Sequence, residues 1–83
     1  MASPQSVEIA RRARLIYDEQ LREGLEREHA NEFVAIEPDS AQFFLGLTLS
    51  EAIQAARRAF PDRLPFALRI GHSSAVHLGA LTS

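Results

Sequence analysis

Residues 43–52 read FFLGLTLSEA and contain the end of one predicted strand and the start of the next predicted helix. The apolar run ends at Gly46, and Thr48 followed three residues later by Glu51 has the pattern of a capping box. In a capping box, the threonine hydroxyl accepts from the backbone N–H of Glu51, and the Glu51 side chain accepts from the N–H of Thr48. This stretch therefore predicts a strand that leads directly into a helix beginning after Thr48.

The segments on either side of this junction complete a β-β-α-β unit over residues 32–71. Residues 32–37 (EFVAIE) and 42–45 (QFFL) are rich in strand formers, and the turn sequence PDSA between them predicts a hairpin. Apolar residues at helical spacing continue from residue 49 to residue 59 or 60. Residues 66–70 (FALRI) alternate in the manner of a third strand.

The order of these strands follows from their connections. A crossover through a helix should return the third strand parallel to the second, whereas the hairpin makes the first two strands antiparallel. The first strand has apolar residues on both faces, as expected for a central strand that is covered on both sides. We therefore predict an α+β fold with a three-stranded, mainly antiparallel sheet in the order 2-1-3.

The N-terminal and C-terminal parts flank this core. Residues 4–29 are predicted to form one long helix that bends or ends near Gly24. Its narrow apolar stripe could pack on the domain's own sheet or on a second copy of the same helix. Residues 72–83 form a C-terminal tail that docks on a sheet edge or on a partner, or frays.

Composition narrows the class of protein. The 83 residues form a single domain, and an apolar fraction of 46% is typical of a globular protein. The sequence has no cysteine, which excludes disulfides and thiolate chemistry and makes a cytoplasmic location the expected one. No apolar run approaches the ~20 residues of a membrane span. The net charge of -2 argues against a general nucleic-acid binder.

Residue types suited to catalysis cluster only near the C-terminus, at His72, Ser73, Ser74 and His77. A serine–histidine pair also needs an orienting acid and an oxyanion hole, and the neighbouring sequence offers neither. Two histidines five residues apart do not match a standard zinc spacing. We therefore predict no enzymatic activity, no metal and no cofactor.

Two groups of charged residues are explained better by their structural roles than by catalysis or phosphate binding. Glu37 and Asp39 flank the hairpin turn, and turn formation explains them better than acid–base catalysis. Arg11, Arg12 and Arg14 form a basic patch on the N-terminal helix that could contact phosphates. Because the same helix also carries acidic residues, we interpret the patch as part of an ordinary solvent-exposed face. Nucleic-acid binding remains the alternative.

The apolar residues indicate a protein-binding surface. Because adjacent strand residues point to opposite faces, either Phe43 or Phe44 should enter the core below the second helix. The other phenylalanine needs cover from the N-terminal helix or from a partner. We therefore predict a homo-oligomer, most simply a dimer, or a complex with a partner protein. The predicted contact residues are Ile9, Ala13, Ile16, Tyr17, Phe43, Phe44, Val76 and Leu78.

Segments 33–36, 44–52 and 66–71 resemble a bacterial family of domains of unknown function with a Gly-x-Thr-Leu-x-Glu-Ala motif. The resemblance implies a hairpin–helix–strand unit with no assigned activity. It also implies gene neighbours that include retropepsin-like aspartyl proteases, so such a protease is a candidate partner. Leu47 stands where that family usually has an aspartate, so any role of that aspartate is absent.

The same motif is similar to the HicB-type antitoxins, which have a partial double-stranded-RNA-binding-like fold and block a small toxin. The Pro-Gly-Cys turn of those antitoxins is absent, and no DNA-binding segment follows the motif. The sequence therefore predicts a non-enzymatic protein–protein interaction module, with an antitoxin-like or nucleic-acid-associated regulator as the alternative.

Overall fold

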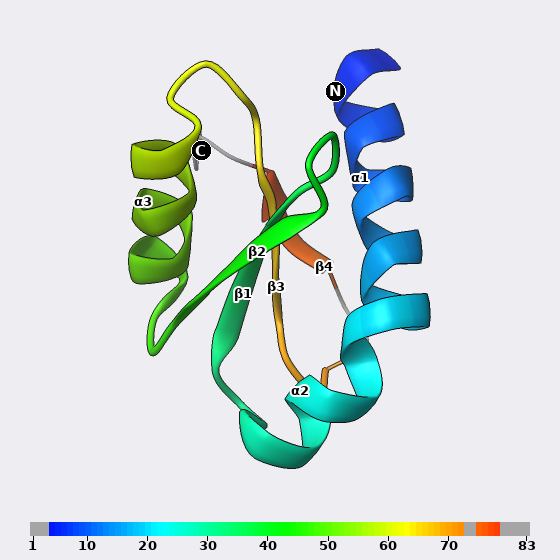
Figure 1. Cartoon of the computed structure of the whole chain (residues 1–83), viewed down its shortest axis with the longest axis vertical. Coiled ribbons are helices and arrows are strands. Elements are labelled where there is room, and N and C mark those ends of the chain that lie inside the picture. Colours follow the sequence, from blue (N-terminus) through cyan, green and yellow to red (C-terminus); the bar gives the residue numbers. More distant parts are fainter. Residues whose placement is uncertain (1–3, 73–74, 79–83) are drawn as a thin grey trace.

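The computed structural model describes residues 4–72 and 75–78, and these form an antiparallel sheet between two helical layers (Figure 1). The sheet has the order β2-β1-β3-β4, so the predicted α+β class and the 2-1-3 order are confirmed. The elements are α1 (Pro4–Ile16), the π-helical segment η1 (Tyr17–Leu21), α2 (Arg22–Glu28), β1 (Phe33–Glu37), β2 (Gln42–Gly46), α3 (Leu49–Ala59), β3 (Phe66–Arg69) and β4 (Ala75–Leu78).

The central strand β1 is buried on both faces, as its two-sided apolar pattern predicts. Val34 and Ile36 belong to the core beneath α1, η1 and α2, together with Tyr17 and Leu68. Ala35 faces α3 in a second core. That second core contains the small residues Ala35, Ala52, Ala56 and Ala67, which let the α3 backbone approach the sheet closely.

The junction between β2 and α3 contains the predicted cap. Thr48 Oγ1 accepts from the backbone N–H of Glu51 at 3.1 Å. The Glu51 carboxylate accepts from the N–H of Leu47 at 3.0 Å, one residue before the predicted Thr48 donor. Gly46 lies against the start of α3, where a Cβ atom would approach the backbone nitrogen of Ala52 to 2.5 Å. The tight turn therefore depends on both the cap and the glycine.

The predicted helix over residues 4–29 is helical from Pro4 to Glu28, but it is not a regular α-helix throughout. Its irregularity is the π-helical segment Tyr17–Leu21, one turn before the predicted weak point at Gly24. In an uninterrupted α-helix, Tyr17 and Leu25 would point about 80° apart, whereas one inserted residue reduces this angle to roughly 20°. The insertion thus lets both side chains reach one core, where each is buried.

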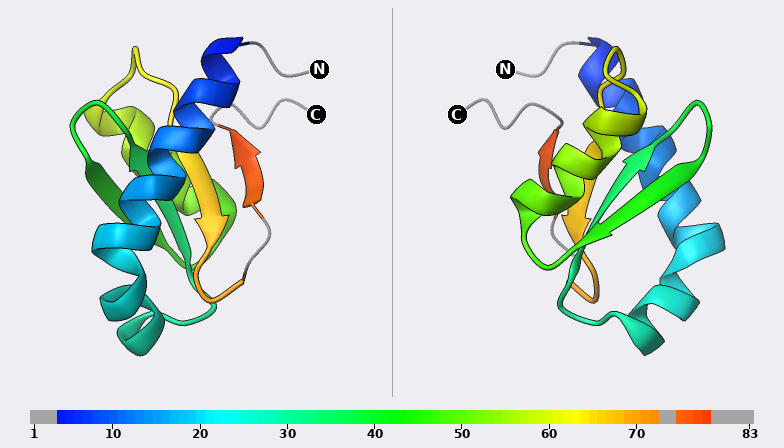
Figure 2. Two further views of the ribbon diagram at one scale, coloured as in Figure 1. Left: turned by 90° about the vertical axis from the view of Figure 1, so that its right-hand side faces the viewer. Right: turned by 60° about the vertical axis from the view of Figure 1, so that its left-hand side comes forward.

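The prediction of three strands is incomplete, because the sheet has a fourth. β4 lies within the predicted tail and pairs antiparallel with β3, with Phe66 opposite Leu78 and an irregularity at Ala67/Leu68 (Figure 2). Residues 75–78 therefore dock on a sheet edge, which is one of the arrangements predicted for the tail. A four-residue strand with an irregular register leaves little periodic signal in the sequence.

Candidate interaction surface

β2 lies at the edge of the sheet. It pairs antiparallel with β1 along one side, and among the described residues no strand pairs with its other side (Figure 2). In an antiparallel ladder every second residue directs its N–H and C=O away from the neighbouring strand, so this outer side carries free backbone groups. Edge strands are usually protected by charges, prolines or bulges, but β2 reads QFFLG and pairs with β1 in a regular register.

A groove of about 310 Å³ runs beside this edge, between β2 and the helical segments η1 and α2. Phe43 and Leu45 form its sheet side, and Phe43 is 40% exposed. Leu21, Gly24 and Leu25 form its helical side. Gly24 contributes no side chain, and nothing lies within 4 Å of the position that its Cβ would occupy. The rim is polar and consists of Gln20, Glu28 and His29.

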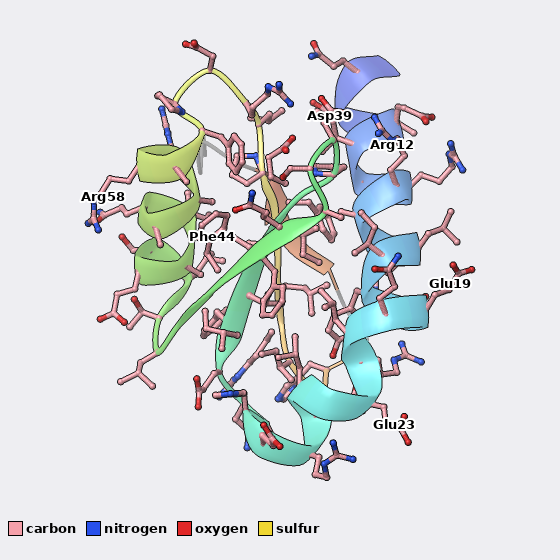
Figure 3. The ribbon with its side chains drawn as sticks, viewed as in Figure 1. Arg12, Glu19, Glu23, Asp39, Phe44 and Arg58 are labelled. Atoms are coloured by element: carbon pink, nitrogen blue, oxygen red, sulfur yellow. The ribbon has the colours of Figure 1, made fainter. Side chains whose placement is uncertain are left out.

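The two adjacent phenylalanines point to opposite faces, as predicted. Phe44 packs beneath α3, where its ring meets that of Phe60 edge to face with centroids 6.3 Å apart (Figure 3). Phe43 is the more exposed of the two, because the helical layer reaches it only at the groove, whereas Phe44 is half-buried. Leu47, just beyond the end of β2, is 72% exposed. Two exposed apolar side chains therefore lie at the β2 edge and just beyond its C-terminal end.

The predicted contact residues on α1 and η1 have a different role. Ala13 and Tyr17 are buried against the chain's own sheet, and Ile9 and Ile16 are half-buried beside them. The helical stripe thus covers the domain's own core, the first of the two arrangements that the sequence leaves open. Val76 lies in β4 and Leu78 stands opposite Phe66 in the backbone register, but their side chains lie outside the described residues.

The basic patch on α1 is engaged within the molecule. Arg11 forms an ion pair with Glu8 at 2.6 Å, and Arg12 forms one with Asp39 at 2.9 Å. The Arg14 guanidinium lies 6.0 Å from the centroid of the Phe66 ring. The two ion pairs reduce the positive charge that the patch would present to a phosphate backbone.

A charged cleft of about 420 Å³ lies where the start of α1, the β1–β2 turn and the loop after α3 meet. Asp39 at the hairpin tip lies beside Arg12 of α1 (Figure 3). It forms ion pairs with Arg12 and with Arg63, at 2.9 Å each. Glu37 is only 2% exposed and accepts from the backbone N–H groups of Asp39 and Ser40 at 3.2 and 2.9 Å.

The environment of Glu37 favours its ionised form. Burial raises the pKa of its carboxyl, but hydrogen bonds from Ser40 and Asp39 and the nearby Arg63 outweigh burial and leave the pKa below the ordinary 4.5. The ionised carboxylate therefore connects the turn with the neighbouring loop. This matches the interpretation of Glu37 and Asp39 as turn-forming residues.

The described histidines are each matched to a nearby polar group. His29 Nδ1 lies 3.3 Å from the Glu32 carboxylate, and His72 Nε2 lies 2.9 Å from Asn31 Oδ1. Within residues 4–72 and 75–78 no three metal-binding side chains come together. Ser73, Ser74 and the side chain of His77 lie outside the described residues. The C-terminal cluster that the sequence singles out is thus placed only in part.

Sequence reasoning identified Phe43 but missed the groove beside it. Leu45 could have been found, because it follows Phe43 by two residues and therefore shares its face. Leu21 and Leu25 are four apart on a helix, so their shared face was also visible in the sequence. Their position opposite Phe43 depends on the π-helical insertion, for which the sequence contains no clear signal.

Comparison with known proteins adds no relative: no family model, curated protein or solved structure matches this chain. The resemblances to a bacterial domain family and to HicB-type antitoxins therefore stay predictions. Within the part of the chain that the structure describes, no helix is both long and apolar enough to cross a lipid bilayer.

Proposed function

We propose that this protein is a non-enzymatic protein–protein interaction module that binds an extended protein segment along the outer side of β2. The observation that carries this proposal is the free, uncharged edge strand QFFLG beside a groove in which Phe43 is 40% exposed. An added strand would satisfy the outward backbone groups of β2, and its alternate side chains would enter the groove.

The surface at β2 can supply binding free energy in two ways if a strand is added there. Strand addition gains main-chain hydrogen bonds, whereas the groove supplies specificity through side-chain burial. Complete burial of a phenylalanine contributes about 1.5–3 kcal/mol, so covering the exposed part of Phe43 would contribute about 1 kcal/mol. Leu21, Leu25 and Leu45 extend the apolar contact, and the polar rim would remain in water.

Nucleic-acid binding is the second candidate function, and among the described residues no unpaired surface comparable to the β2 edge supports it. For nucleic-acid binding, Arg11 and Arg12 would have to exchange their carboxylate partners for phosphates. The protein-binding proposal needs no such exchange, since no strand within residues 4–72 and 75–78 pairs with the outer side of β2. Among possible partners, the sequence resemblance implies a retropepsin-like protease as one candidate. The absence of cysteine supports the proposal of a cytoplasmic setting.

Site-specific photo-crosslinking in the native host tests the proposal. A photoreactive benzoylphenylalanine in place of Phe43 should crosslink to protein on irradiation, because this side chain lies at the proposed contact. The matched control places the same group at Leu15, which has a similar exposure of 45% but lies on α1. Crosslinking at position 43 that does not exceed crosslinking at position 15 would contradict the proposal.

A further inference from the structure

We infer that the segment bound by β2 is β2 of a second copy, so that two sheets join into one continuous sheet about a two-fold axis at Phe44. This inference rests on the proposed function and names the partner. Its basis is that β2 is complementary to itself in both backbone register and side chains, and that an antiparallel pairing keeps the acidic ends of the two helical layers apart.

The backbone register follows from the edge itself. Only residues that direct their N–H and C=O outward can bond across a new strand pair, and these are every second residue of β2. A symmetric antiparallel pair must therefore match residues an even number of positions apart. Among such registers, the one centred on Phe44 is the only one that pairs all five residues Gln42–Gly46 within the strand.

In this register the side chains match. Phe43 of one copy lies opposite Leu45 of the other, and both face the groove side of the sheet. Gln42 lies opposite Gly46, so the one polar side chain of the strand meets a residue without a side chain. No charged residue occurs in β2, so the pairing brings no like charges together.

The charge distribution of the helical layer is compatible with this pairing. The start of α1 lies at the hairpin end of β2, where Arg12 contacts Asp39, whereas η1 and α2 line the groove beside Phe43 and Leu45. The helix α1 carries three arginines and one glutamate, but η1 and α2 together carry five carboxylates and two arginines. Because the even register keeps both helical layers on one face, the α1 end of each copy, where Arg11 and Arg12 are paired with carboxylates, lies nearest the acidic η1–α2 end of the other, so the two acidic ends stay apart.

The first test is the oligomeric state measured by sedimentation over a range of concentrations. A five-residue edge gives an interface at the low end of the usual size range, so we expect a dimer that dissociates on dilution, with a Kd on the order of micromolar. Phe43→Lys places a charge on the edge and should leave only monomer. Leu15→Lys is the matched control and should dimerise like the unmodified chain.

The second test fixes the register. The chain has no cysteine, so single introduced cysteines report unambiguously. A mixture of the Phe43→Cys and Leu45→Cys variants should oxidise to a mixed disulfide, because directly opposite residues have Cβ atoms about 4.5–5.5 Å apart. Each variant alone should crosslink much less, because its cysteines lie diagonally about 7–8 Å apart. Equal crosslinking of the single variants would overturn the register centred on Phe44.

The outcomes separate this inference from the proposed function. A chain that stays monomeric at millimolar concentration, but whose position 43 crosslinks to a different protein, overturns the second-copy inference and leaves the interaction module intact. A dimer that Leu15→Lys abolishes and Phe43→Lys does not would overturn the placement at β2. A monomer without crosslinking at position 43 would overturn both.

Discussion

At Gly46, where β2 meets α3, the space above the Cα atom is already filled. A Cβ atom would lie 2.5 Å from the backbone nitrogen of Ala52 and 2.9 Å from Cβ of Glu51. Both atoms belong to the first turn of α3, whose position is fixed by the cap at Thr48. The backbone therefore cannot accommodate a side chain here without moving the helix away from the sheet.

We expect Gly46→Ala to lower the free energy of unfolding by about 1–3 kcal/mol, as overpacking does at other crowded sites. The matched control is Gly24→Ala in α2, where the added methyl group would meet nothing within 4 Å. That substitution should instead raise the free energy of unfolding by about 0.5–1 kcal/mol, since alanine favours the helix. Urea denaturation of both variants measures this, and equal effects of the two substitutions would refute the close-approach argument.

Glu37 is a buried carboxylate whose pKa lies below its ordinary value of 4.5 in the folded state. A group with a depressed folded pKa stabilises the protein above its ordinary pKa, and this contribution is lost as the pH falls through the folded value. We expect Glu37→Gln to cost about 1–3 kcal/mol at neutral pH, because two backbone N–H groups lose a charged acceptor.

The cost of Glu37→Gln should shrink when the pH falls below 4.5, where the unmodified chain loses its own advantage. Urea denaturation at neutral and at acid pH measures the difference between the two chains. Glu19→Gln, which removes a carboxylate from the exposed side of η1, controls for the change in net charge (Figure 3). A cost that does not depend on pH would contradict the assigned role of the Glu37 charge.

At the scale of elements, the π-helical segment η1 links two helices that share one core. Its first residue, Tyr17, is buried, and its hydroxyl donates to Glu26 of α2 at 3.0 Å. The N–H of Gly71, in the turn after β3, approaches the same hydroxyl at 3.5 Å. The side chain of one residue thus joins η1, α2 and the end of β3.

Tyr17 is the only tyrosine in the chain, and there is no tryptophan, so its ionisation can be followed directly by ultraviolet absorbance. Burial disfavours the phenolate, and the pKa of Tyr17 is therefore above the ordinary 10.0 despite the opposing hydrogen bond from Gly71. We expect the folded protein to titrate above pH 10.0 and the urea-unfolded protein to titrate near it.

The sign of the effect on stability follows from this shift. A raised folded pKa means that the contribution is complete below pH 10.0 and is lost as the pH rises through the folded value. The Tyr17→Phe variant cannot ionise there and should lack this alkaline loss. If folded and unfolded protein titrated together, the buried position of the hydroxyl would be wrong.

At the scale of the whole molecule, the sheet formed by the described residues has two edge strands, β2 and β4, and each is paired on one side only. The two faces are covered unequally, since α3 reaches Phe44 but the opposite helical layer leaves Phe43 partly open. This asymmetry places a partly open apolar side chain beside the unpaired backbone groups of β2. It is the physical basis of the proposed assembly.

Dimerisation through β2 predicts that thermal stability depends on protein concentration. Because only folded chains pair, raising the concentration should raise the Tm of the unmodified chain and of Leu15→Lys. The Tm of Phe43→Lys should not change with concentration. Calorimetry at several concentrations measures this, and a Tm independent of concentration for all three chains would contradict the dimer.

Much of this architecture can be predicted from local patterns. The hairpin, the cap at Thr48, the helix Leu49–Ala59 and the central place of β1 follow from turn residues, spacing and two-sided hydrophobicity. The opposite directions of Phe43 and Phe44 follow from strand geometry alone. The groove does not, because its helical side depends on how η1 places Leu21 and Leu25 against the sheet.

The sequence by itself determined the β-β-α-β order, the β1–β2 hairpin and the turn held by Glu37, because each depends on residues close together in the chain. The antiparallel pairing of β1 with β3 joins residues far apart in the chain, and it was predicted from the rules of strand connection. Only the tertiary structure decided that α1 and η1 cover their own sheet, that residues 75–78 add a fourth strand beside β3, and that Phe43 remains partly open at the opposite edge. These outcomes depend on long-range packing, in which a half-apolar helix or a short strand has several possible partners and takes the one that buries the most surface.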